Sequence, residues 1–109
     1  MVSMTDALVV LCTFPSKAEA RQIGTHLVER QYAACVNILP FAESIYLWEG
    51  KLCQEQEICT IFKTTRQAFP VMSRELKALH PYDEPEIIAL PAVDGSAGYL
   101  DWLIGGVNP

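Results

Sequence analysis

A histidine, a tyrosine and three carboxylates are concentrated in the stretch ALHPYDEPEI, residues 78–87. Imidazole and carboxylate groups are ligands for metal ions, so the cluster suits a chemical site. It has an equally sensible structural interpretation, because Pro81 ends a helix at His80 and Pro85 permits an extended entry into a strand. The rest of the chain has to decide between these two interpretations.

The cysteines are the other residues whose type suggests metal chemistry: Cys12, Cys35, Cys53 and Cys59. They form no C-x-x-C pair and no zinc-finger spacing, and each lies in or beside an apolar, strand-like segment. We expect most of them to be buried free thiols, because a reduced cysteine behaves as a small core hydrophobe. A metal role therefore has to be supported for each thiol separately.

The composition is that of a single domain, residues 1–109, with 50% apolar and 19% charged residues. The formal net charge of −5 gives no attraction to nucleic acid or to an anionic membrane, so neither is an expected partner. The N-terminus lacks the basic region of a secretory signal, and the apolar run after it is too short for a membrane span. We therefore expect a cytoplasmic protein.

The first elements that position these residues are a strand and a helix. The apolar run at residues 7–14 predicts a central strand covered on both faces. Residues 16–19, SKAE, form a capping box in which the Ser16 hydroxyl caps the helix start and Glu19 reaches back. The helix that follows buries one apolar face. His26 lies on it without a neighbouring ligand type, so we expect a surface or structural histidine.

A long hairpin follows. Residues 34–39 predict a second strand, which Pro40 interrupts as a bulge or edge break before residues 44–48 continue it. Glu49 and Gly50 have the pattern of a two-residue hairpin turn, in which Gly50 supplies the positive φ. Residues 51–65 then predict a return strand whose first half is exposed and whose second half is buried.

The last part of the chain predicts a second helix, a strand and a short extension. Helical spacing begins near Phe69, with Thr65 as N-cap, and the helix ends at His80. Residues 86–93 predict the last strand, and residues 99–104 a terminal helix or an added strand. The order β-α-β-β-α-β is that of an α+β, ferredoxin-like fold with a C-terminal extension.

This topology predicts where the reactive residues meet. Following the strands up and down, Cys12, the hairpin turn and His80 lie toward one end of the sheet, whereas Cys35 lies at the other. Both helices cover the same face, yet the first and last strands are apolar on both sides, so something must cover the open face. We therefore expect a homo-oligomer, with the aromatic hairpin reaching a neighbouring subunit.

Several phrases of the sequence resemble the CutA family of divalent-cation-tolerance proteins: LCTFPS, ACVNI, SIYLWEGKL, IFKTT, LHPYDEPEIIALP and GYLDWL. They stand in the order and spacing of the family from about Ala7 to Leu103. The resemblance implies a ferredoxin-like subunit in a tight homotrimer, similar in assembly to the PII-type signalling trimers. It also implies binding of copper or other divalent cations, and no enzymatic activity.

The resemblance also implies metal ligands. Cys12 and His80 match the family positions proposed to bind copper, although some members carry two adjacent histidines where this chain has Leu79 and His80. Thiolate and imidazole suit copper and zinc, and Cu²⁺ has the highest affinity among the divalent first-row ions. We expect no metal to be required for folding. The alternatives are a core thiol at Cys12 and a helix-end histidine interacting with the helix dipole at His80.

Two ligands are too few for a closed four-coordinate site. A third group would come from Asp83, Glu84 or Glu86, from a water, or from another subunit.

A second set of residues also matches family positions. Trp48, Lys63 and Tyr82, with Glu86 nearby in sequence, form an aromatic and charged set suited to a pocket for a small anion or metabolite. Packing and strand pairing explain the two aromatic residues equally well, so this pocket is an alternative to the metal site.

The leading functional hypothesis is a metal-responsive or signal-transducing trimer that binds divalent cations. The alternatives are a structural trimeric scaffold with incidental metal binding and a PII-like regulator that binds a small ligand. An enzyme is not expected, because the chain has no Gly-rich loop with an arginine to cradle a phosphate. It also has no Walker motif, no G-x-S-x-G elbow and no H-E-x-x-H motif.

Overall fold

The computed structural model describes residues 5–108. The ends of the predicted domain 1–109, and most of the N-terminal stretch in which we expect no signal, lie outside the described residues. The element order confirms the predicted α+β arrangement: β1 (Ala7–Phe14), α1 (Lys17–Glu29), β2 (Cys35–Trp48), β3 (Lys51–Thr65), α2 (Phe69–Leu79), β4 (Ile88–Pro91) and α3 (Ala97–Gly105). The C-terminal extension is thus a helix. None of the helices in the described part of the chain is long and apolar enough to cross a membrane.

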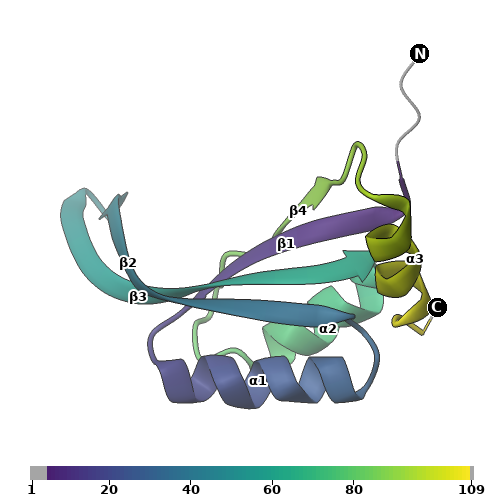
Figure 1. Ribbon diagram of the computed structural model, residues 1–109. Coiled ribbons are helices and arrows are strands. Elements are labelled where there is room, and N and C mark those ends of the chain that lie inside the picture. Colours follow the sequence, from purple (N-terminus) through teal and green to yellow (C-terminus); the bar gives the residue numbers. More distant parts are fainter. Residues whose placement is uncertain (1–4, 109) are drawn as a thin grey trace.

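The strands form one antiparallel sheet in the order β2-β3-β1-β4, and α1 and α2 cover one face of it (Figure 1). β1 is central, as its continuous apolar run predicts. Its alternate residues face the helices and are buried: Leu8, Val10, Cys12 and Phe14. This face positions Cys12 inside the domain.

α1 begins at the predicted cap. The Ser16 hydroxyl oxygen accepts a hydrogen bond from the Glu19 backbone N–H at 3.2 Å, which satisfies one free donor of the first turn. The reciprocal bond differs from the prediction, because the Ser16 hydroxyl donates to Glu19 Oε1 at 2.9 Å. At Gly24 the helix approaches β2 so closely that an added Cβ would lie 3.1 Å from Val36 Cγ1.

The hairpin of β2 and β3 extends beyond the helices as a curved arm (Figure 1). Glu49 and Gly50 turn the chain with φ values of 51° and 77°, as the sequence predicts. The interruption predicted at Pro40 is a register shift between Leu39 and Ala42. A positive φ of 71° at Phe41 accompanies this bulge.

Two predicted boundaries were wrong. α2 begins at Phe69 with Ala68 as its N-cap, whereas Thr65 Oγ1 accepts from the Ala68 backbone N–H at 3.2 Å and so stabilises the turn before the helix. The last strand spans Ile88–Pro91 rather than residues 86–93, because only four residues of β1 pair with it. Glu86 consequently lies outside the sheet.

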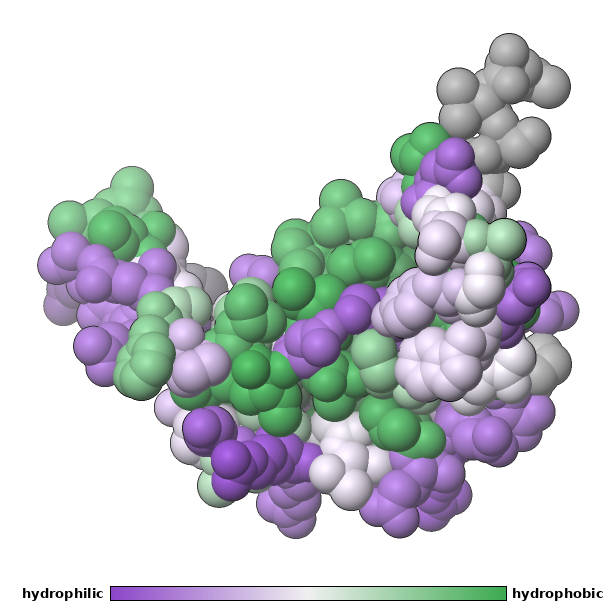
Figure 2. All heavy atoms as spheres, in the orientation of Figure 1, coloured by the Kyte–Doolittle hydropathy of each residue, from purple (hydrophilic) through white to green (hydrophobic). Residues whose placement is uncertain are grey.

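α1 and α2 leave the second face of the sheet uncovered, and α3 reaches only one end of it, where the Tyr99 hydroxyl lies 3.9 Å from Cys35 Sγ. The side chains of this face include half-buried Val9 and Leu11, together with Ile88 and Leu90, which are 52% and 46% exposed. Figure 2 shows apolar side chains gathered over this hollowed face, between the arm and α3. We call it the open face. Its apolar character confirms the predicted two-sided sheet.

Candidate functional site

Cys12 lies in the core between the sheet and the helices and has no exposed surface. Burial raises the pKa of its thiol to about 12, and the charges of Glu86, Cys59 and Glu57 contribute to this rise in pKa. The thiol is therefore protonated at neutral pH. Because the thiolate is the form that binds metals, Cys12 in this conformation is a core side chain and not a ready ligand.

The other three cysteines differ from the expectation that most would be buried. All four are free thiols, as expected, but Cys35, Cys53 and Cys59 are partly exposed. The physical reason is strand alternation. Cys35 and Cys59 point to the open face, and Cys53 lies on the same side of the arm. α1 and α2 do not cover this side, and only Cys35 has a contact with α3, 3.9 Å from the Tyr99 hydroxyl.

His80 follows the last residue of α2 and is 7% exposed. Its Nδ1 accepts a hydrogen bond from the Tyr82 backbone N–H at 3.1 Å, so the ring proton is on Nε2, which lies 2.7 Å from the Thr13 carbonyl oxygen. The ring also stacks on Phe14, with centroids 4.5 Å apart. Both nitrogens are thus engaged, and neither has a lone pair directed at a metal.

Burial lowers the pKa of the His80 imidazole below its ordinary value of 6.5. The hydrogen bond to Thr13 and the charges of Glu19 and Glu57 act in the opposite direction but do not outweigh burial. Protonation of Nδ1 would also oppose two donors, because the Tyr82 N–H points at this atom. The neutral ring is therefore the favoured form in the folded protein at neutral pH.

The structure confirms the prediction that Cys12 and His80 lie toward the same end of the sheet. His80 contacts the two residues that follow Cys12 on β1, namely Thr13 and Phe14. Cys12 and His80 thus lie at the same end of the sheet. However, no three His, Cys, Asp or Glu side chains among residues 5–108 come together in a way that would hold a metal ion.

The acidic residues of the 78–87 stretch do not complete a site. Asp83, Glu84 and Glu86 are exposed, and Glu84 lies 3.8 Å from Lys77 in a surface ion pair. Of these carboxylates, only Glu86 is close enough for its charge to raise the pKa values of Cys12 and Cys59.

The acidic residue that the sequence did not reveal is Glu57. It is 8% exposed, lies just beyond the end of β1, and accepts a hydrogen bond from the Tyr82 hydroxyl at 2.8 Å. Burial raises the pKa of Tyr82 above its ordinary value of 10.0, and the Glu57 carboxylate raises it further. Alternation predicts only that Glu57 shares a face with Cys59. No local pattern links it to a tyrosine 25 residues away.

The predicted pocket residues meet β3 at three widely separated positions. Trp48 pairs with Lys51 at the tip of the arm, Tyr82 bonds to Glu57, and Lys63 hydrogen-bonds to Asn37 Oδ1 on the open face. The three β3 positions, Lys51, Glu57 and Lys63, are six residue steps apart, which is about 20 Å along a strand. A single chain therefore does not bring Trp48, Tyr82 and Lys63 around one ligand.

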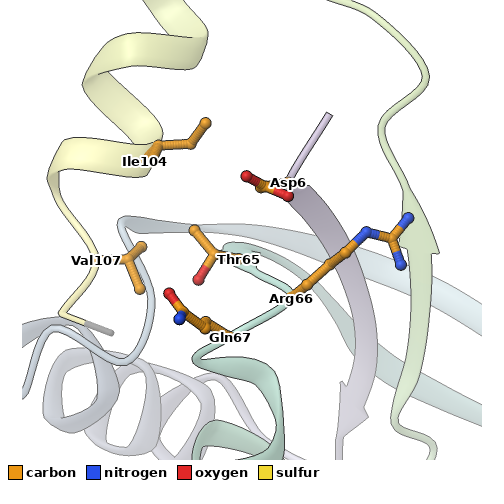
Figure 3. A pocket seen from close by; sticks show the side chains of 6 residues that line it. All are labelled: Asp6, Thr65, Arg66, Gln67, Ile104 and Val107. Atoms are coloured by element: carbon orange, nitrogen blue, oxygen red, sulfur yellow. The ribbon is translucent and has the colours of Figure 1, made fainter. Parts of the chain in front are cut away.

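A cavity of about 370 Å³ lies at the opposite end of the sheet, beside α3. Figure 3 shows its lining residues: Asp6, Thr65, Arg66, Gln67, Ile104 and Val107. The Arg66 side chain extends away from the other five, and its backbone N–H donates to the Asp6 carbonyl at 2.9 Å. None of the predicted site residues lines this cavity.

Known proteins match almost the whole chain. Residues 8–105 match the family described as CutA1 divalent ion tolerance protein. A divalent-cation tolerance protein CutA from Thermus thermophilus is 53% identical over 95 residues, 87% of this chain and 92% of the relative. A solved structure of a divalent cation tolerance protein from the same species has a TM-score of 0.91 at 49% identity, covering 94% of this chain and 99% of that one. A structure from Archaeoglobus fulgidus, described as a periplasmic divalent cation tolerance protein, has a TM-score of 0.89 at 38% identity, covering 94% and 99%.

Proposed function

Because this chain belongs to the CutA1 divalent ion tolerance family, we propose that it acts in tolerance of divalent cations by binding them as a homotrimer. The observation that carries this proposal is the family match, which spans residues 8–105. Cu²⁺ is the preferred ion in the proposal, because it heads the affinity order for nitrogen and sulfur ligands. The role is non-catalytic, and the chain's location in the proposal is the cytoplasm, although one similar structure is described as periplasmic.

The open face supports the oligomer. Monomeric proteins rarely expose contiguous apolar patches larger than a few hundred Å². Ile88 and Leu90 are about half exposed on this face, beside half-buried Val9 and Leu11. The arm adds exposed apolar side chains, with Trp48 at 60% and Leu47 at 71%. Neighbouring copies would bury these surfaces. Trp48 would thereby come close to groups that its own chain keeps distant.

Cys12 and His80 are the ligands suggested by the family resemblance. In the conformation described they do not fit a ready metal site, because the Cys12 thiol is protonated and both His80 nitrogens are hydrogen-bonded. This observation favours the second candidate function, a trimeric scaffold or small-ligand-binding regulator in which metal binding at these two residues is incidental.

Equilibrium dialysis against Cu²⁺ tests the proposal with the wild type, Cys12→Ala and His80→Ala. Cys53→Ala is the matched control, because Cys53 is a partly exposed thiol on the arm. The proposal expects stoichiometric copper in the wild type and the control, and less in the two site variants. Unchanged stoichiometry in both site variants would remove Cys12 and His80 as ligands. A wild type that takes up no divalent cation would leave the scaffold or regulator as the function.

A further inference from the structure

His26 on α1 and Glu75 on α2 meet on the helical side of the molecule. His26 Nε2 lies 3.0 Å from Glu75 Oε1, although the two residues are 49 positions apart in the sequence. Their side chains are 33% and 39% exposed, so water reaches both. Beside them is a groove of about 240 Å³, lined by Glu19, Gln22, Ile23, His26 and Leu79.

The distance between the two ligand atoms fits joint coordination as well as a hydrogen bond. Metal–nitrogen and metal–oxygen bonds in proteins are about 2.0–2.2 Å long. Two such bonds at 90° to 109° hold their ligand atoms roughly 2.9–3.4 Å apart. The 3.0 Å separation of His26 Nε2 and Glu75 Oε1 lies in this range. An ion could therefore replace the shared proton without separating the two side chains, once the imidazole ring turns so that Nε2 is directed at the ion rather than at Oε1.

Gln22, whose amide oxygen is a possible third ligand, lies on the same side of α1. It lies four residues before His26 on α1, a spacing that places both on one helix face, and both line the groove. Since no three His, Cys, Asp or Glu groups gather around one point within residues 5–108, the remaining positions would be filled by this amide oxygen and by water. Such a site exchanges its ion readily and binds less tightly than a closed four-ligand site.

We propose that His26 and Glu75 form a site for a divalent first-row cation, separate from Cys12 and His80. Imidazole with carboxylate suits Zn²⁺, Ni²⁺ and Cu²⁺, whereas Mg²⁺ and Ca²⁺ prefer oxygen ligands alone. The site rests on the proposed function, to which it adds a cation position on the helical side, opposite the open face. The site would therefore remain accessible in an oligomer that buries the open face.

Calorimetric titration of the full chain with Zn²⁺ tests this site in the wild type, His26→Ala and Glu75→Gln. Glu75→Gln keeps a hydrogen-bond partner for His26 but removes the carboxylate. Glu29→Gln is the control, because it removes an exposed carboxylate elsewhere on α1. We expect an apparent Zn²⁺ affinity at least about tenfold lower in both site variants and unchanged in the control. Glu75→His should raise the affinity by supplying a second imidazole.

The outcomes separate this site from the proposed function. Equal Zn²⁺ affinity in the wild type, His26→Ala and Glu75→Gln would reduce the contact to an ion pair that joins α1 to α2, and the proposal would be overturned. It would also be overturned if Cys12→Ala and His80→Ala lost the cation while His26→Ala retained it, a result that leaves the proposed function intact. Loss confined to His26→Ala and Glu75→Gln supports the site.

Discussion

His80 Nε2 donates a hydrogen bond to the Thr13 carbonyl oxygen across 2.7 Å. Through this bond the end of α2 is joined to the end of β1, the central strand. The carbonyl belongs to Thr13, the residue after Cys12. The hydrogen bond therefore links the segments that carry the two predicted metal ligands. A histidine in this position stabilises the fold whether or not it binds an ion.

His80→Ala should lower the stability of the folded protein by about 2–3 kcal/mol, because it removes a buried hydrogen bond and the ring contact with Phe14. Thermal denaturation at a fixed protein concentration measures the effect. His26→Ala is the comparison, since that side chain is 33% exposed and its loss should cost less. Equal melting temperatures for the wild type and His80→Ala would contradict this structural role.

Acid should destabilise the wild type through His80. Its pKa is lowered in the folded state, so below pH 6.5 the unfolded chain binds the proton more readily than the folded chain. The stabilising contribution is complete above pH 6.5 and is lost as the pH falls from there through the folded pKa. Between pH 5 and 7.5 the melting temperature should therefore rise more steeply with pH in the wild type than in His80→Gln. Parallel slopes would show that His80 does not titrate in this way.

Tyr82→Phe should destabilise the protein by about 1–3 kcal/mol, because it leaves the buried Glu57 carboxylate without its hydroxyl donor. Glu57→Gln should cost less, since the amide oxygen still accepts from Tyr82. A double-mutant cycle measured by denaturant unfolding gives the coupling between the two residues. Additive effects would mean that the 2.8 Å contact contributes nothing to stability.

Cys12 should resist alkylation in the native protein. It has no exposed surface, and burial raises the pKa of its thiol to about 12, so the reactive thiolate is scarce at pH 8. Iodoacetamide labelling followed by peptide mass spectrometry should detect modified Cys12 only after denaturation. Labelling of native Cys12 at the rate seen in denaturant would place the thiol at the surface.

Charge on the open face should prevent assembly of the proposed homotrimer. Ile88→Lys replaces a side chain that is 52% exposed in the single chain, so folding of the chain itself should be little affected. Sedimentation velocity should show the mass of one chain for this variant. Leu79→Lys is the matched control, because Leu79 is 43% exposed on α2, away from the open face. A wild type that sediments as a single chain would exclude the oligomer altogether.

Local patterns predicted most of the fold. The bounds of β1, the Ser16 cap and the turn at Glu49 and Gly50 follow from residues that interact with near neighbours in the sequence. The errors lie where a distant partner decides. β4 is shorter than its apolar run because β1 pairs with four of its residues, and Thr65 caps a turn rather than α2.

The site was predictable to a smaller extent. The sequence left a core thiol at Cys12 open as the alternative to a metal ligand, and the topology placed Cys12 and His80 toward the same end of the sheet. Neither the residue pattern of a strand nor the topology predicts side-chain contacts between distant segments, such as Tyr82 with Glu57 or His26 with Glu75. These contacts depend on how the helices and the loop after α2 settle on the sheet, which no short sequence pattern encodes.

The bulge in β2 makes the shape of the arm depend on a single residue. Three steps from Leu39 to Ala42 oppose two steps from Cys59 to Glu57, so β2 carries one residue more than the ladder requires. Deleting Phe41, whose φ is positive, would leave every later pair of the ladder in register and the same side chains on each face. Only the curvature would change. A one-residue deletion could thus redirect the arm without redesigning its surface.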